Sequence, residues 1–285
     1  MIEFVFMLTH HDRTVDDPAG VYEQVRGCGL RYVGFKDIGA TVAQLRDVCD
    51  RAHEDGLEVM LEVVSTTRED ELRSVAAAAQ IGVDWLLGGT HPQDALKILG
   101  GTGAGGTGAA EAGGTRAGGK GAAEAGGAGG AGGAGGAGGT GGAGGAGGAG
   151  GAGGAGGYRP RYCPFPGTVV GHPSILRGEI GEIAQSARRI TALDGVFGLD
   201  LLAYRHESAD AAELTRAVVR AASGPVIAAG SVASTGQIRA LDEAGAWGFT
   251  IGGAIFEGRL PGAPSVAGQV SEVLRAAAGP GREPG

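Results

Sequence analysis

Cysteine is scarce, because only three of the 285 residues are Cys and no CxxC pair occurs. Three widely spaced cysteines exclude a disulfide scaffold and a cysteine-based zinc site, and they are typical of a reducing compartment. Long apolar runs are also missing, since no stretch of about 18 apolar residues could span a membrane. The N-terminal segment has no basic residues before its short apolar stretch, so no signal peptide is expected. These absences predict a cytoplasmic protein without a membrane partner.

Positive charge is in deficit, with 23 Lys and Arg against 31 Asp and Glu and a net charge of −8. Because no basic cluster occurs, nucleic acid is not an expected partner. His10 and His11 are adjacent and point in different directions, and no third ligand follows at a metal-binding spacing. We therefore expect neither a metal nor another cofactor. The oligomeric state stays open, homo-oligomers included.

Glycine is abundant, with 61 residues, but 33 of them lie in the segment 100–157. That segment has close to two Gly per triplet and no Pro, unlike a collagen helix. It offers no side chain large enough to offset its ordering entropy. We interpret 100–157 as a flexible, dispensable Gly/Ala-rich insertion. It divides one domain into residues 1–99, carrying four structural units, and residues 158–278, carrying four more; a disordered tail, 279–285, follows.

Outside the insertion, strand-like and helix-like stretches alternate. The strand-like stretches are near-continuous apolar runs, as expected for a parallel sheet covered on both faces. Eight such units predict an α/β fold, a single (β/α)₈ TIM barrel with its active site where the strands end. A doubly wound sheet would need a Gly-rich loop after the first strand, where LTHHDRTV stands instead. The predicted strands are 3–8, 32–37, 57–65, 83–90, 162–167, 196–204, 225–231 and 247–256.

Two of the predicted strands end in small residues. The seventh ends in Gly230 and Ser231, and the eighth contains Gly252 and Gly253, each followed by a helix-like stretch. Missing side chains let backbone N–H groups approach an anion, and loops after the seventh and eighth strands hold phosphate in many barrels. We therefore predict that these four residues bind a phosphate group.

The stretch PVIAAGSVASTGQIRALDEAGAWGFTIGGAIFEG resembles the ribulose-phosphate-binding barrels. Within that superfamily it is most similar to the phosphoribosyl isomerase of histidine synthesis, and the detailed resemblance covers about 35 residues. That isomerase family uses a carboxylate at the end of strand one and another at the end of strand five. Here Leu8 and Thr9 end the first strand, residues 164–166 read Pro-Phe-Pro, and Asp12 is the nearest carboxylate at the first position. The reaction of that family is therefore not carried over.

Lys36 and Glu62 are the leading candidates for catalysis. Lys36 is one of only three lysines and stands near the end of the second apolar strand, and Glu62 stands near the end of the third. A partly buried lysine can form a Schiff base or move a proton, and a neighbouring carboxylate can relay that proton. Asp37 is an alternative partner for the lysine. A purely structural Lys–Glu ion pair remains the alternative to a catalytic pair.

Further polar residues follow other predicted strands. Ser65 ends the third strand, and Thr90 ends the fourth after two glycines, where a second anion-binding turn is an alternative to a structural one. His172 lies in a Pro-containing loop after the fifth strand. Arg205 ends the sixth, and its planar fork suits a carboxylate or phosphate. All four are predicted to contact the substrate. The alternatives are a general acid or a loop-packing imidazole for His172 and a surface salt bridge for Arg205.

The sequence thus predicts an enzyme for a small phosphorylated, sugar-phosphate-like metabolite. The expected carbonyl chemistry is that of an isomerase or epimerase, or of an aldolase-type lyase, with Lys36 and Glu62 at its centre and Asp12 and Asp37 beside them. The alternatives are a non-catalytic barrel that binds a phosphorylated ligand and, less directly, a scaffold that assembles through its Gly-rich segment.

Overall fold

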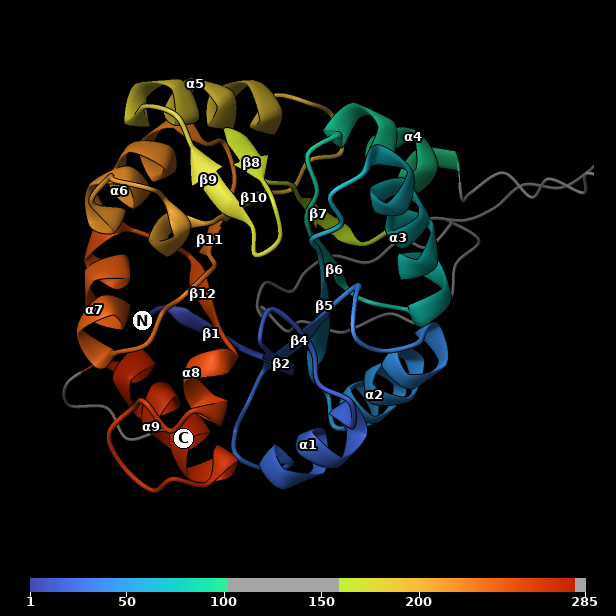
Figure 1. Ribbon diagram of the computed structural model, residues 1–285, viewed down its shortest axis with the longest axis vertical. Coiled ribbons are helices and arrows are strands. Elements are labelled where there is room, and N and C mark those ends of the chain that lie inside the picture. The colour runs from blue at the N-terminus through green and yellow to red at the C-terminus, as the bar shows by residue number, and fades with distance from the viewer. Residues whose placement is uncertain (102–158, 280–285) are drawn as a thin grey trace, which may run out of the picture. The chain divides into compact units, whose positions relative to one another are not determined.

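The computed structural model describes residues 1–101 and 159–279 (Figure 1). An eight-stranded parallel sheet runs through it in the order β10-β11-β12-β1-β4-β5-β6-β7. Its strands are β1 (Glu3–Met7), β4 (Tyr32–Lys36), β5 (Glu58–Val63), β6 (Trp85–Gly88), β7 (Arg161–Cys163), β10 (Leu199–Leu201), β11 (Val226–Ala228) and β12 (Gly248–Ile251).

The sheet closes on itself where β7 meets the segment that leads into β10. Tyr162 and Val196 form a parallel bridge there. The N–H of Phe197 donates to the carbonyl of Tyr162 at 2.8 Å, and the N–H of Asp200 donates to the carbonyl of Pro164 at 3.1 Å. The predicted (β/α)₈ barrel is therefore confirmed.

Helices surround the strands and cover the outer face of the sheet (Figure 1). Several begin at the side chains that favour a helix start: Thr41 and Gln44 form a capping box before α2, and Ser234 caps α7. The helices are α1 (Pro18–Val25), α2 (Val42–Glu54), α3 (Arg68–Ile81), α4 (Pro92–Gly101), α5 (Ile180–Thr191), α6 (Ala211–Ala221), α7 (Thr235–Ala244), α8 (Gly253–Phe256) and α9 (Val266–Ala278).

The barrel interior is filled by every second residue of its strands. Because side chains alternate across a strand, one set packs inward and the other packs against the helices. Trp85 and Trp247 lie with ring centroids 5.0 Å apart at the amino-terminal end of the interior. The inward apolar set is Val5, Met7, Tyr32, Met60, Trp85, Leu87, Cys163 and Ile227. The aromatic end is closed, so space for a ligand remains at the carboxyl ends of the strands.

Two short hairpins, which the sequence predicted only as loops, project from that end of the barrel. One joins β2 (Thr9–His10) to β3 (Arg13–Thr14) after β1, and the other joins β8 (Thr168–Val170) to β9 (Ile175–Arg177) after β7. Strands this short carry no readable alternation of polar and apolar residues. The helix after this hairpin, α5, starts only at Ile180, because Leu176 and Arg177 belong to β9 and pair with β8.

Two predicted strands also end earlier than their apolar runs suggest. The sixth strand, predicted over 196–204, is only Leu199–Leu201 and is followed by the 3₁₀ turn η1 (Ala203–Arg205). The eighth, predicted over 247–256, stops at Ile251, and Gly252 caps the short helix α8. An apolar run alone does not separate a buried strand from a buried helical turn.

The predicted insertion at 100–157 and tail at 279–285 lie almost entirely outside the described residues, so they remain sequence predictions. Among the helices of residues 1–101 and 159–279, none has the length and apolar character needed to cross a membrane.

Candidate functional site

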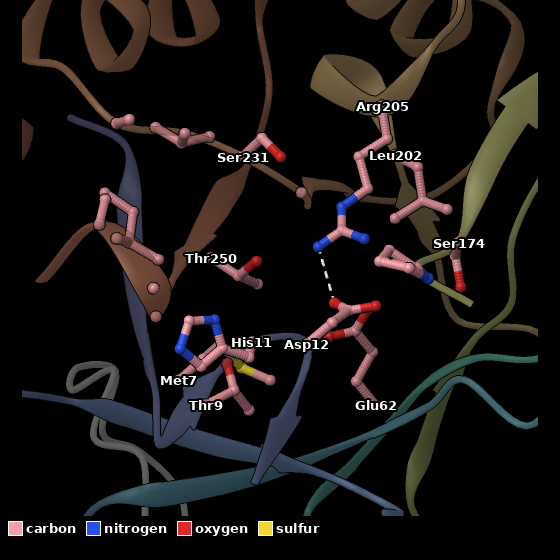
Figure 2. Close-up of a pocket in the computed structure, with 18 of the residues that line it drawn as sticks. Met7, Thr9, His11, Asp12, Glu62, Ser174, Leu202, Arg205, Ser231 and Thr250 are labelled. Atoms are coloured by element: carbon pink, nitrogen blue, oxygen red, sulfur yellow. Dashed lines mark hydrogen bonds and ion pairs between the residues drawn. The ribbon is translucent and has the colours of Figure 1, made fainter. Parts of the chain in front are cut away.

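A cavity of about 710 Å³ opens at the carboxyl ends of the barrel strands (Figure 2). Its walls come from the ends of β1, β4, β5 and β12, from the loops after β1, β10, β11 and β12, and from the β8–β9 hairpin. This is the end at which barrel enzymes carry their active sites. Eight of the residues singled out in the sequence line it: Asp12, Lys36, Glu62, Arg205, Gly230, Ser231, Gly252 and Gly253.

Lys36 and Glu62 are direct register partners on β4 and β5. Their side chains therefore share the inner face of the sheet, and only 5% of Lys36 and 3% of Glu62 is exposed. Lys36 Nζ lies 3.6 Å from Glu62 Oε2. The Asp37 carboxylate, one residue further on, instead accepts hydrogen bonds from the Val64 N–H and the Ser65 hydroxyl. Asp37 is thus not the partner of Lys36 in this structure.

Asp12 reaches the cavity from the turn of the β2–β3 hairpin. His11 and Asp12 have φ values of 48° and 62°, the left-handed pair of a two-residue hairpin turn. Aspartate tolerates this region better than most residues. Thr14 fixes the hairpin on β4: its hydroxyl accepts from the Lys36 N–H at 2.9 Å and donates to the Lys36 carbonyl at 2.8 Å. Asp12 is consequently brought against Lys36, whose ammonium donates to its carboxylate.

Arg205 completes the charged cluster from the turn after β10. It donates to Asp12 Oδ1 at 2.7 Å (Figure 2). A Cβ on Gly230 would lie 2.7 Å from Cγ of Arg205, so the glycine leaves the room that the arginine side chain occupies. Asp12 thereby holds two cations on one oxygen. Its Oδ2 has no hydrogen-bond partner among the described residues, and His172 Nδ1 lies 3.5 Å from it.

The two carboxyls beside Lys36 differ in proton affinity. Burial acts to raise the pKa of Asp12, but the charges and hydrogen bonds of Lys36 and Arg205 outweigh it and hold that pKa below its usual value. Burial raises the pKa of Glu62 above its usual value, although the Lys36 ammonium opposes the rise. Asp12 is therefore a fixed anion, whereas Glu62 is the carboxyl suited to exchanging a proton.

A third carboxyl, Asp200, was not among the predicted site residues. It lies on β10 and is fully buried, and neither of its oxygens has a hydrogen-bond partner among the described residues. Burial, followed by the charge of Glu62, raises its pKa well above the usual value, against the opposing charges of Lys36 and Arg205. A lone acidic residue within the apolar run GLDLLAY was the available signal for it.

The loops after β11 and β12 present backbone donors to the cavity. The N–H groups of Gly230, Ser231, Gly252 and Gly253 have no hydrogen-bond partner within the described part of the chain. Gly252 also allows a close approach of the β2–β3 hairpin, because a Cβ there would lie 2.4 Å from Thr9 Oγ1. The expected helix start beside Gly230 and Ser231 is displaced, since α7 begins four residues later at Thr235. The donors at Gly230 and Ser231 are therefore loop amides, whereas Gly252 and Gly253 stand at the start of α8.

Four predicted residues do not line the main cavity. Asp37 and Ser65 bond to each other, as described above. His172, whose Nδ1 lies 3.5 Å from Asp12 Oδ2, lines a neighbouring cavity of about 500 Å³ instead. Thr90 is bound through its N–H and hydroxyl to the buried carboxylate of Glu71, at 3.0 and 3.1 Å. Within residues 1–101 and 159–279, no group of three or more His, Cys, Asp or Glu side chains is placed to hold a metal ion.

Comparison with known proteins finds likeness in structure alone. No protein-family model and no curated protein matches the sequence. Orotidine 5′-phosphate decarboxylase from Pyrococcus horikoshii OT3 is similar with a TM-score of 0.54 and 11% identity, over 97% of this chain and 99% of that chain. N-acetylmannosamine-6-phosphate 2-epimerase from Clostridium perfringens gives 0.50 and 8%, over 88% and 86%. A structure named native KDPGal gives 0.50 and 13%, over 96% and 91%. At these identities the likeness establishes the barrel fold.

Proposed function

We propose that this protein is an enzyme that acts on a small phosphorylated metabolite and exchanges a proton on the carbon next to its carbonyl group. The observation that carries the proposal is the position of Lys36, between Asp12 and Glu62 in the wall of a cavity at the carboxyl end of the barrel. Two carboxyls whose pKa values are displaced in opposite directions around one cation are the equipment of general acid–base catalysis.

Each member of the cluster has a distinct role in this proposal. Glu62 takes the proton from carbon and returns it, because its raised pKa brings proton exchange closer to neutral pH. The Lys36 ammonium stabilises the negative charge that develops on the carbonyl oxygen. Asp12 stays ionised, orients Lys36 and Arg205, and offers its unpartnered Oδ2 to a substrate hydroxyl.

Proton exchange is favoured over Schiff-base chemistry by the contacts of Lys36. A lysine attacks a carbonyl as the neutral amine, whereas both contacts of Lys36 are those of an ammonium with a carboxylate. The isomerase or epimerase branch of the predicted chemistry is therefore preferred to the aldolase branch.

Phosphate anchoring is assigned to the wall formed by the loops after β11 and β12. The four unpartnered N–H groups there supply donors for an anion, and Lys36 and Arg205 line the same cavity. Two of the structural neighbours are named for phosphorylated compounds, which supports the choice of ligand class. A fixed phosphate would position the reacting carbon against Glu62.

The first test is a thermal-shift screen with sugar phosphates and inorganic phosphate, followed by solvent deuterium exchange. A ligand at 100 times its Kd stabilises the fold by about 2.7 kcal/mol. With a stabilising ligand, the wild type should incorporate deuterium at one carbon. Glu62→Gln should bind the ligand, but its exchange rate should fall at least about 100-fold. Glu54→Gln, on the exposed face of α2, is the matched control and should behave as wild type.

Three outcomes would contradict parts of the proposal. If no phosphate compound raises the melting temperature, the anion anchor is wrong. If a ligand binds but wild type exchanges no deuterium and forms no product, the protein is a non-catalytic binding barrel. If borohydride traps the ligand on Lys36, the chemistry belongs to the aldolase branch.

A further inference from the structure

The loop after β6 already contains an anion, and that anion belongs to the protein. The Glu71 carboxylate, carried by α3 and 1% exposed, accepts hydrogen bonds from the N–H groups of Thr90 at 3.0 Å and His91 at 2.8 Å. The Thr90 hydroxyl at 3.1 Å and His91 Nδ1 at 2.8 Å contact the same carboxylate. Two successive amides and two side chains therefore converge on one carboxylate.

The backbone of this loop is shaped around the carboxylate. Gly88 and Gly89 have φ values of 78° and 81°, and a Cβ on Gly89 would lie 2.7 Å from Glu71 Oε1. Successive amides in such a turn form an anion-binding concavity. Here the concavity is filled, so a phosphate could bind only by displacing a buried carboxylate.

A side pocket of about 240 Å³ lies next to this loop and shares Ser174 with the main cavity. Four hydroxyl-bearing residues line it, together with apolar side chains that include Phe165 and Val169; they are Ser65, Thr66, Thr90 and Ser174. The Ser65 and Thr90 hydroxyls already donate to Asp37 and Glu71, so their oxygens are left as acceptors. Among its described lining residues there is no Lys, Arg or His. The pocket therefore offers hydroxyls and apolar surface to a ligand and no positive charge.

We propose that the substrate carries a single phosphate, bound by the loops after β11 and β12, and an uncharged, hydroxyl-bearing end that enters the side pocket beside Glu71. This inference rests on the proposed function and adds the substrate class to it. Glu71 is the specificity-determining residue: its charge repels a second phosphate, and its hydrogen bonds occupy the amides that such a phosphate would need.

The test compares mono- and bisphosphates on the same carbon skeleton. The probes are ribulose 5-phosphate with ribulose 1,5-bisphosphate and fructose 6-phosphate with fructose 1,6-bisphosphate, measured by titration calorimetry on the full chain. Wild type should bind the monophosphate of a pair at least about tenfold more tightly, the factor expected for unmade hydrogen bonds to a charged group. Glu71→Ala should reduce or reverse that ratio. Glu69→Ala, an exposed neighbour on α3, is the matched control and should leave the ratio unchanged.

Glu71→Gln decides the question if Glu71→Ala does not fold. The Thr90 and His91 N–H groups donate to different oxygens of Glu71, so the single amide oxygen of the variant can accept from only one of them. The negative charge is also gone, so discrimination against the bisphosphate should weaken. Equal binding of both ligands by wild type, or the same ratio in wild type and the Glu71 variants, would overturn the inference. Failure of the proposed function looks different: no probe binds wild type, while Glu71→Ala would still gain affinity for inorganic phosphate if the loop is an occupied anion site.

Discussion

Lys36 and Glu62 are register partners on adjacent strands of the barrel, and their charged atoms lie 3.6 Å apart with almost no exposure to solvent. Removing one side chain leaves the charge of the other buried without its partner. This lowers the free energy of unfolding by far more than an exposed ion pair contributes. The pair thus carries a structural cost beside the catalytic role proposed for it, and measurement can separate the two.

A double-mutant cycle over this pair should be strongly non-additive. Lys36→Met and Glu62→Gln each disturb the charge balance of the cluster, whereas the double variant removes both charges together. We expect the summed losses in unfolding free energy to exceed the loss of the double variant by about 1–3 kcal/mol. Urea denaturation of the four proteins measures this difference. Additive losses would mean that the two side chains act independently.

Asp12→Asn should destabilise the fold in a pH-dependent way. Neutralising a buried partner of Lys36 and Arg205 should cost about 3 kcal/mol or more at neutral pH. Because the folded-state pKa of Asp12 is lowered, its contribution is present above its usual value of 3.8 and disappears as the pH falls through the folded-state pKa. The difference between wild type and variant should therefore shrink on acidification. A constant difference from pH 7 down to pH 3 would contradict this assignment.

Part of this charged cluster could be predicted from the sequence. Lys36 and Glu62 were predictable because each stands near the end of an apolar run, and parallel strands bring such ends to one edge of the barrel. Asp12 was identified by its place after the first strand. Its arrival against Lys36 depends on a two-residue hairpin turn that no periodicity reveals.

The predicted roles of Thr90 and Asp37 illustrate the limit. Two glycines before Thr90 correctly indicate an unusual backbone. The group bound in this turn, however, is the carboxylate of Glu71, which comes from α3, the helix before β6. Asp37 differs from Lys36 by one position, and that position selects the face of the strand. Side-chain reach and strand parity are properties of the folded chain, so sequence reasoning left both open.

Asp200→Asn should stabilise the protein at neutral pH. With its folded-state pKa raised, the carboxyl favours folding fully below its usual value of 3.8, and that contribution is lost as the pH rises toward the folded-state pKa. The neutral amide avoids this loss, which amounts to about 1.4 kcal/mol for every tenfold difference in proton affinity between the folded and unfolded states. Unfolding free energies from pH 4 to 8 should show a gain that grows with pH. Asp50→Asn, exposed on α2, should show no such trend.

Gly230→Ala should damage the site through Arg205. The position has a φ of 81°, and the added Cβ would lie 2.7 Å from Cγ of Arg205. Gly56→Ala is the matched control, because its φ is 78° and a Cβ there meets nothing within 4 Å. The control should cost about 1–2 kcal/mol for the left-handed backbone alone, and Gly230→Ala about 1–3 kcal/mol more for crowding. Displacing Arg205 also takes a hydrogen bond from Asp12, so ligand affinity should fall in Gly230→Ala and remain unchanged in the control. Equal losses of stability and unaltered ligand binding in both variants would show that Arg205 does not depend on the space that Gly230 leaves.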